Sequence, residues 1–148
     1  MLDERIYESY IGILKEEMVP AMGCTEPIAL AYGAARAREV LGKEPEHITA
    51  KCSGNIIKNV RCVIIPNSGG LTGIEAGVVL GAVAGNASLN MEVLSNVNEF
   101  ERKRCRELLD KKICNVELLD SPVVLHFIIE MQAGDDTCLL YTSPSPRD

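Results

Sequence analysis

Apolar residues recur at three- and four-residue steps near the start of the chain, with Glu and Lys between them. This spacing predicts an amphipathic helix over about residues 3–18, which Pro20 ends. A second helix is predicted from about Thr25 to Leu41. Thr25 or the following Glu can cap it, proline is favoured in a first turn, and Gly42 stops it.

Short runs rich in β-branched residues alternate with turn signals in two parts of the chain. Ile48–Ser53 and Val60–Ile65 predict two strands around a polar connection. Val116–Leu119 and Val123–Met131 predict two more, joined by a turn that contains Pro122.

Glycine occurs at every fourth position between Leu71 and Gly85. This period predicts a helix with a smooth ridge, and each interior glycine costs about 1 kcal/mol relative to alanine, which close packing can offset. A membrane span is the alternative, but the stretch is shorter than the ~20 apolar residues that a span needs. It also contains Glu75, so we expect a buried core helix.

A further helix is predicted from Asn98 to about Lys112, because Asn98 can cap it and Glu101 completes a capping box. No repeat and no linker divides residues 1–137. The elements together predict one α+β domain, in which amphipathic helices and short strands pack around the buried glycine-rich helix.

The composition fits a soluble globular domain, with 47% hydrophobic and 24% charged residues. The net charge is −6, and the 15 Lys and Arg residues form no basic run. We therefore expect no binding to nucleic acid or to an anionic membrane. Because no basic segment followed by an apolar core opens the chain, we expect a cytoplasmic protein.

The last residues, 138–148, change abruptly to a tract rich in Ser and Pro without periodicity. They resemble the translation of a transposase-type sequencing adapter, and a natural disordered tail is the alternative. We predict that residues 138–148 are a non-native tail and that the natural sequence is cut near Thr137.

Cys24 lies in Gly23–Pro27, at the predicted start of the second helix. The positive end of the helix dipole and unpaired N–H groups favour the thiolate, which is the form that binds metals. A lone cysteine is also commonly a small buried hydrophobic residue. These residues alone leave both interpretations open.

The other cysteines have no comparable setting, and no Cys-x-x-Cys pair occurs, so we predict reduced, structural thiols. His126 falls in an apolar strand and His47 in a turn, and neither is assigned a role. The structural set is Cys52, Cys62, Cys105 and Cys114, with Cys138 in the tail.

Two polar connections, Ser53–Asn59 and Asn67–Gly73, gather hydroxyl, amide and ammonium groups with free N–H groups at a helix start. Together they could hold a small anion. The second lacks the ending of a P-loop, so a carboxylate fits better than a nucleotide phosphate. Ordinary turns are the alternative.

Three segments occur in this order, Gly23–Pro27, Ser53–Asn59 and Ile65–Gly70, and the glycine-rich helix follows them. They resemble motifs of the L-cysteine desulfidase family, which is related to the α part of iron–sulfur-dependent L-serine dehydratases. The resemblance covers about residue 10 to Gly85 and extends more weakly to Thr137. It implies that the chain is the amino-terminal part of such a protein.

The resemblance further implies a [4Fe-4S] cluster held by three cysteines, of which Cys24 is one and the other two belong to a carboxy-terminal half. The implied reaction eliminates sulfide, or water, from a small L-amino acid such as L-cysteine to give pyruvate and ammonia. Without two ligands, the chain alone is expected to be inactive. The residues expected to bind the substrate or support the cluster are Ser53, Asn55, Lys58, Asn67, Ser68, Gly69 and Gly70.

Three alternatives remain at this point. The same family includes L-serine dehydratases, and cysteine and serine preference cannot be separated from these residues. The chain could be a non-catalytic small-anion-binding module with a structural Cys24. A cluster-free thiol enzyme with Cys24 as nucleophile is the third, although no His stands in an evident partner position. A homo-oligomer is left open.

Overall fold

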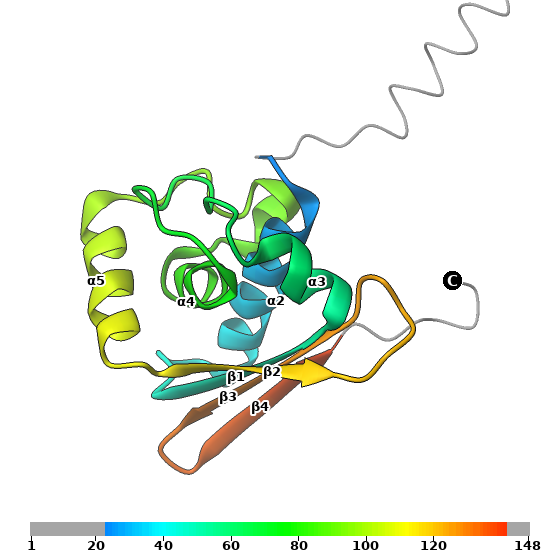
Figure 1. Ribbon diagram of the computed structural model, residues 1–148. Coiled ribbons are helices and arrows are strands. Elements are labelled where there is room, and N and C mark those ends of the chain that lie inside the picture. The colour runs from blue at the N-terminus through cyan, green and yellow to red at the C-terminus, as the bar shows by residue number, and fades with distance from the viewer. Residues whose placement is uncertain (1–22, 142–148) are drawn as a thin grey trace, which may run out of the picture.

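The computed structural model describes residues 23–141 as an α+β fold in two layers, which confirms the predicted class (Figure 1). A four-stranded sheet forms one layer, and the helices lie against one of its faces. The helix predicted over residues 3–18 lies outside the described residues. The elements are α2 (Thr25–Leu41), β1 (His47–Ser53), α3 (Gly54–Val60), α4 (Ile74–Ala84), the 3₁₀ helix η1 (Ala87–Glu92), α5 (Glu99–Asp110), β2 (Cys114–Leu119), β3 (Phe127–Ala133) and β4 (Asp136–Tyr141).

Helix α2 forms where the apolar spacing predicts it. Its last turn ends at Gly42, which has φ 78° and whose N–H donates to the Arg38 carbonyl over 2.9 Å. This left-handed conformation suits glycine, since it has no Cβ. The cap at the other end differs from the prediction, because Cys24 takes that position in place of Thr25 or Glu26.

The sheet has the strand order β2-β1-β3-β4. Strand β1 pairs parallel with β2 and antiparallel with β3, and β4 is antiparallel to β3. Side chains alternate along β1, so that Ile48, Ala50 and Cys52 are buried under the helices while Thr49 and Lys51 face outward. No described element covers this outward face (Figure 1).

The strand predicted over Val60–Ile65 is wrong. Helix α3 occupies Gly54–Val60, and only an isolated bridge from Ile64 to Thr72 follows it. Ile56 and Val60 are both buried and stand four residues apart, which places them on one face of a short helix. The segment predicted as a polar connection between two strands is therefore a helix, because this spacing lets Ile56 and Val60 both reach the core.

Helix α4 is the predicted glycine-ridged core helix. A Cβ on Gly81 would lie 2.3 Å from the carbonyl oxygen of Ala31 in α2, and one on Gly85 would lie 2.8 Å from the Ala35 Cβ. Glycine therefore allows the backbones of α2 and α4 to approach closely. No helix within residues 23–141 has the length and apolar content that are needed to cross a bilayer.

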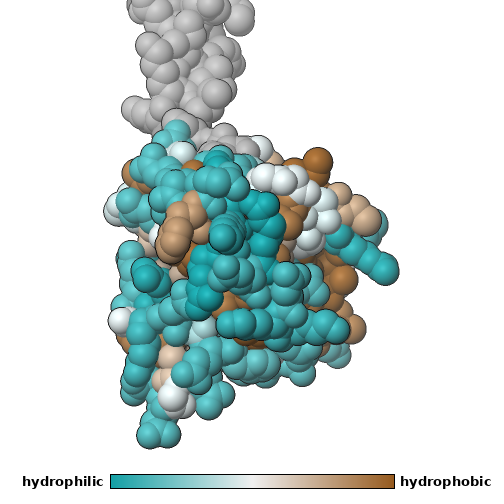
Figure 2. Space-filling model, turned by 90° about the vertical axis from the view of Figure 1, so that its left-hand side faces the viewer, coloured by the Kyte–Doolittle hydropathy of each residue, from teal (hydrophilic) through white to brown (hydrophobic). Residues whose placement is uncertain are grey.

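Helix α5 begins where the capping box predicts. The Asn98 side-chain oxygen accepts the Glu101 N–H at 2.8 Å, and Cys105 and Leu108 face the core. Charged residues cover most of the remaining helix surface, beside the exposed Phe100, and the face of the molecule on the α5 side is largely hydrophilic (Figure 2).

The boundary predicted after Thr137 falls inside β4. In this strand Thr137 pairs with Gln132 and Cys138 pairs with Met131. Cys138 is 8% exposed and packs against the core, so the tract from residue 138, which shows no periodicity in the sequence, continues strand β4 as far as Tyr141. Residues 138–141 form a strand because they pair with β3, and the residue pattern of one segment does not show such pairing. The adapter origin of residues 138–148 stays a prediction.

Candidate functional site

The three sequence segments that suggest chemistry meet at one end of α2. A Cβ on Gly23 would lie 3.7 Å from the ring of Pro66, so the start of α2 borders the Pro66 loop. The side-chain amide of Asn59, in the last turn of α3, donates to Glu26 over 3.4 Å. We call the surface formed by residues 23–26, 58–59 and 66–70 the junction.

Cys24 is exposed at the junction, and its thiol donates a hydrogen bond to Glu26 at 3.1 Å. The pKa of Cys24 is raised, first because its proton binds Glu26 and further because that carboxylate is negative. The pKa of Glu26 is lowered, mainly by this bond and also by the bond from Asn59. The prediction that the helix start favours the thiolate is therefore corrected, because a carboxylate two residues away opposes the dipole.

This pair makes a chemical prediction about thiol reactivity. Replacing Glu26 by Gln removes the negative charge, so the pKa of Cys24 falls and more thiolate is present at pH 8. We expect iodoacetamide to alkylate Cys24 roughly two- to fivefold faster, since the gain in thiolate is partly offset by lower nucleophilicity. The measurement is mass spectrometry of alkylation against time and pH.

The matched control is Glu39→Gln, which removes the same charge from the other end of α2. Both variants carry Cys62→Ser, because Cys62 is also exposed. An unchanged or slower rate in Glu26→Gln, or an equal gain in Glu39→Gln, would show that the carboxylate does not control the thiol.

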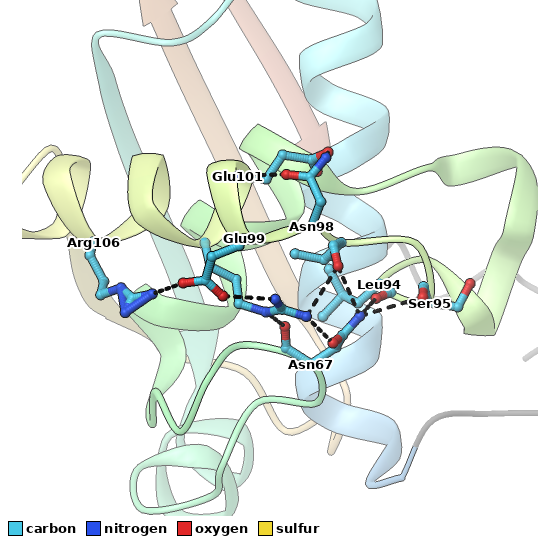
Figure 3. Close-up of polar contacts among 9 residues, drawn as sticks. Asn67, Leu94, Ser95, Asn98, Glu99, Glu101 and Arg106 are labelled. Carbon is cyan, nitrogen blue, oxygen red and sulfur yellow. Dashed lines mark hydrogen bonds and ion pairs between the residues drawn. The ribbon is translucent and has the colours of Figure 1, made fainter.

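Asn67 holds the loop that forms the other side of the junction (Figure 3). It has φ 59°, and its side-chain amide donates to the carbonyl oxygens of Leu94, Ser95 and Val97, the shortest bond being 2.9 Å to Leu94. Arg102 of α5 donates both to the Asn67 backbone oxygen at 2.8 Å and to its side-chain oxygen. All polar atoms of the Asn67 side chain are thus used inside the protein, and its role is to shape the loop.

Ser68 also stabilises the loop from within. It is 1% exposed, and its hydroxyl accepts the Leu71 N–H at 2.9 Å and lies 3.3 Å from the Leu71 carbonyl. Gly69 and Gly70 follow with φ 77° and 93° and are exposed. Their N–H groups donate no hydrogen bond within residues 23–141, so they are the loop groups that remain open to a ligand.

The remaining predicted residues lie on α3 or at its start. Ser53 is buried, and its hydroxyl donates to the Val124 carbonyl at 2.9 Å, which ties β1 to the chain before β3. Asn55 is half-buried in the first turn, and Lys58 is exposed in the last turn beside Asn59. Among these side chains, Lys58 is the exposed cation of the junction.

Sequence reasoning missed two participants, Asn59 as a partner of Glu26 and Arg102 as the support of Asn67. Asn59 stood inside the motif, but a predicted strand after it hid its place at a helix end. Arg102 acts from 35 positions away in the sequence. The sequence predicts only that Arg102 lies one turn after the start of a capped helix.

The described residues do not by themselves supply three cysteine ligands for a [4Fe-4S] cluster. Cys52 and Cys105 are buried, and burial raises the pKa of each to about 12. Between residues 23 and 141 no group of three or more Cys, His, Asp or Glu side chains could hold a metal ion. Cys24 is the one thiol at the junction, and a cluster with three cysteine ligands needs two more.

The places predicted for the two histidines are wrong, because His47 begins β1 and His126 lies just before β3. His126 is partly buried, and its Nδ1 lies 2.8 Å from the Ser121 hydroxyl, while His47 is exposed at the start of β1. Neither lies among the segments that form the junction.

The chain is similar to proteins from several bacteria. A UPF0597 protein of Treponema denticola is 46% identical over 136 residues, which are 92% of this chain and 32% of that protein. UPF0597 proteins of Desulfitobacterium hafniense and Lachnoclostridium phytofermentans are 47% and 43% identical over 128 and 135 residues. The chain spans about a third of the length of these relatives. No family model and no solved structure matches the chain.

These similarities correct the family expected from the motifs. The relatives carry the name UPF0597, and their names mention neither a cysteine desulfidase nor a serine dehydratase. The assignment to the L-cysteine desulfidase family, and with it the iron–sulfur lyase reaction, is therefore wrong on this comparison. The three short motifs indicated the wrong family because each consists of turn and helix-cap residues. In the structure, Ser53, Asn67 and Ser68 use their side chains in hydrogen bonds that stabilise the fold.

Proposed function

We propose that the junction binds a small amino acid, with Glu26 accepting the ligand's ammonium group and the Gly69 and Gly70 amides donating to its carboxylate. The observation that carries the proposal is the Asn67–Arg102 support, which holds an exposed glycine pair in a left-handed conformation with unused N–H groups. Amides fixed before binding lose little entropy when a carboxylate arrives.

The charges of the junction match a zwitterion. Hydrogen bonds from Cys24 and Asn59 keep the pKa of Glu26 low, so that its carboxylate is ionised at neutral pH. Lys58 adds an exposed positive charge beside Asn59. An anion alone would be repelled by Glu26, whereas an amino acid presents both signs. Enzymatic activity of any class stays a prediction.

Titration of the whole chain with L-serine tests this function. We expect saturable shifts of the Gly69 and Gly70 amide resonances, and smaller effects from lactate, which lacks the ammonium, and ethanolamine, which lacks the carboxylate. Glu26→Gln should weaken serine binding by roughly tenfold, the value of one charge-assisted hydrogen bond.

Lys58→Met should weaken binding less, because an exposed charge is screened by water. Glu39→Gln and Lys103→Met are the controls, since each removes an exposed charge away from the junction. Serine shifts that do not saturate, or equal responses to lactate and serine, would contradict the amino-acid site.

A further inference from the structure

Strand β2 leaves one edge of the sheet open. It pairs with β1 only, and Ile48 donates its N–H to the Ile113 carbonyl at 2.8 Å. This register turns the backbone groups of Asn115 and Glu117 toward β1. The N–H and C=O groups of the alternate residues face away from the sheet, where no described strand meets them. Those residues are Cys114, Val116 and Leu118. A free strand edge of this kind is a template for another strand.

Apolar side chains form part of the core side of the open edge, beside the charged Glu75 and Lys112. Leu118 is 70% exposed although its place in the alternation is on the buried face. Beside Cys114 lies a hollow of about 400 Å³, whose walls include Leu109 and Glu75. A second, smaller hollow of about 200 Å³ adjoins Val116. The edge therefore offers both an exposed leucine and spaces that could receive one.

Charges at the two ends of β2 have opposite signs. Lys111 and Lys112 precede the strand, while Glu117 and Asp120 stand at its far end, and all four are exposed. None of them forms an ion pair among residues 23–141. A strand with a basic start and an acidic end is complementary to an antiparallel copy of itself, because each basic end then lies beside an acidic end.

We propose that β2 is a dimerisation edge, which pairs antiparallel with β2 of a second copy around a twofold axis at Val116. In this register Cys114 stands opposite the partner's Leu118. Lys112, in the turn that leads into β2 with φ 54°, is at the same end as the partner's Asp120. The partner's Leu118 then reaches the hollow next to Cys114. The two four-stranded sheets join into one continuous sheet.

Charge selects this register among the nearest alternatives. A shift by two residues in one direction sets Glu117 against Glu117 of the partner, and like charges directly opposite are unfavourable. A shift in the other direction places Lys112 opposite Leu118 and takes it away from Asp120. The proposed register instead pairs Asn115 with Glu117 and keeps both ends of the strand complementary. This inference does not depend on the amino-acid site.

A charge swap tests the interface in the whole chain. Sedimentation velocity over a range of concentrations should show a dimer. Lys112→Glu alone and Asp120→Lys alone should each raise the dimer dissociation constant by roughly tenfold, because each change acts twice in a twofold dimer. The double variant should restore the wild-type value. The control Lys103→Glu makes the same charge change on α5 and should leave dimerisation unaltered.

Disulfide trapping tests the register. In the Cys24→Ser, Cys62→Ser background, Leu118→Cys would bring the new thiol opposite Cys114 of the partner. Hydrogen-bonded antiparallel pairs have Cα atoms about 5.5 Å apart, which suits a disulfide. Mild oxidation with diamide should then yield a covalent dimer, whereas Ile64→Cys, also at an exposed apolar position, should not.

Three results would overturn the proposal. These are a monomer at every concentration, a dimer that ignores the charge swap, and a dimer that Leu118→Cys does not trap. A monomer would show that no second copy pairs with β2. A dimer that ignores the charge swap, or that Leu118→Cys does not trap, would show that the dimer contact lies elsewhere. If the wild-type chain forms the dimer but does not bind serine, the proposed amino-acid site is contradicted and the dimer proposal is not.

Discussion

Replacing Gly81 by alanine is expected to lower the free energy of unfolding by about 3 kcal/mol. The added Cβ would lie 2.3 Å from the carbonyl oxygen of Ala31 and 2.6 Å from its Cα. Both atoms belong to the backbone of α2, so no side-chain rotation can relieve the contact. The helices must separate, and the buried surface between them loses its packing. Alanine's better helix propensity, worth about 1 kcal/mol, offsets only part of this cost.

Gly77→Ala in the same helix is the matched control. There the nearest atom is the end of the Ile65 side chain at 3.3 Å, which can move by a few tenths of an ångström. We expect this variant to be within about 1 kcal/mol of the wild type, because the propensity gain opposes a small strain. Urea denaturation followed by circular dichroism measures both. Equal stabilities of the two variants would contradict the close α2–α4 contact.

Arg102→Met is expected to lower the free energy of unfolding by about 2 to 3 kcal/mol, because partly buried acceptors lose their donor. The guanidinium donates to both oxygens of Asn67 and to the Val97 carbonyl at 3.1 Å. Its side chain is 20% exposed, so water replaces few of these bonds. Methionine retains most of the apolar length of the side chain, and the loss therefore reports on the hydrogen bonds.

Arg106→Met, one turn further along α5, is the control for this change. Arg102 and Arg106 both bind the Glu99 carboxylate, at 3.1 Å and 3.0 Å, but Arg106 is 44% exposed. Exposed ion pairs contribute about 0 to 1 kcal/mol, so little stability should be lost. Hydrogen exchange at Ile65 and Leu71, whose N–H groups are bonded within the loop, adds a local readout, which should accelerate in Arg102→Met only. If both variants lose the same stability, Arg102 is not the support of the loop.

The helices show how much of this fold its sequence predicts. Their positions follow from local signals, namely Gly42 after α2, the Asn98–Glu101 box before α5, and glycine at every fourth position in α4. Such signals act within a turn or two, and so they can be read without the rest of the chain. Residues 54–60 were not predicted as a helix, because their polar residues indicate a connection and only the burial of Ile56 and Val60 in the core selects the helix.

The sequence predicted which segments form the candidate site but not what each of their residues does. The three segments do meet, as Glu26 with Asn59 and Gly23 with Pro66 show. Ser53, Asn67 and Ser68 were predicted to bind a ligand, yet their side chains form hydrogen bonds within the fold. A residue's type predicts which hydrogen bonds it can make, whereas its partner depends on chain segments far away in the sequence.

The sequence by itself determined the α+β class, the helix ends and the glycine ridge, since these depend on backbone geometry and on apolar spacing within a few residues. Only the tertiary structure decided the order of the strands, including β4 beyond Thr137. It also decided the raised pKa of Cys24 beside Glu26 and the open edge of β2. Strand pairing and pKa both depend on which groups approach in space, and that follows from the packing of the whole core rather than from any local pattern.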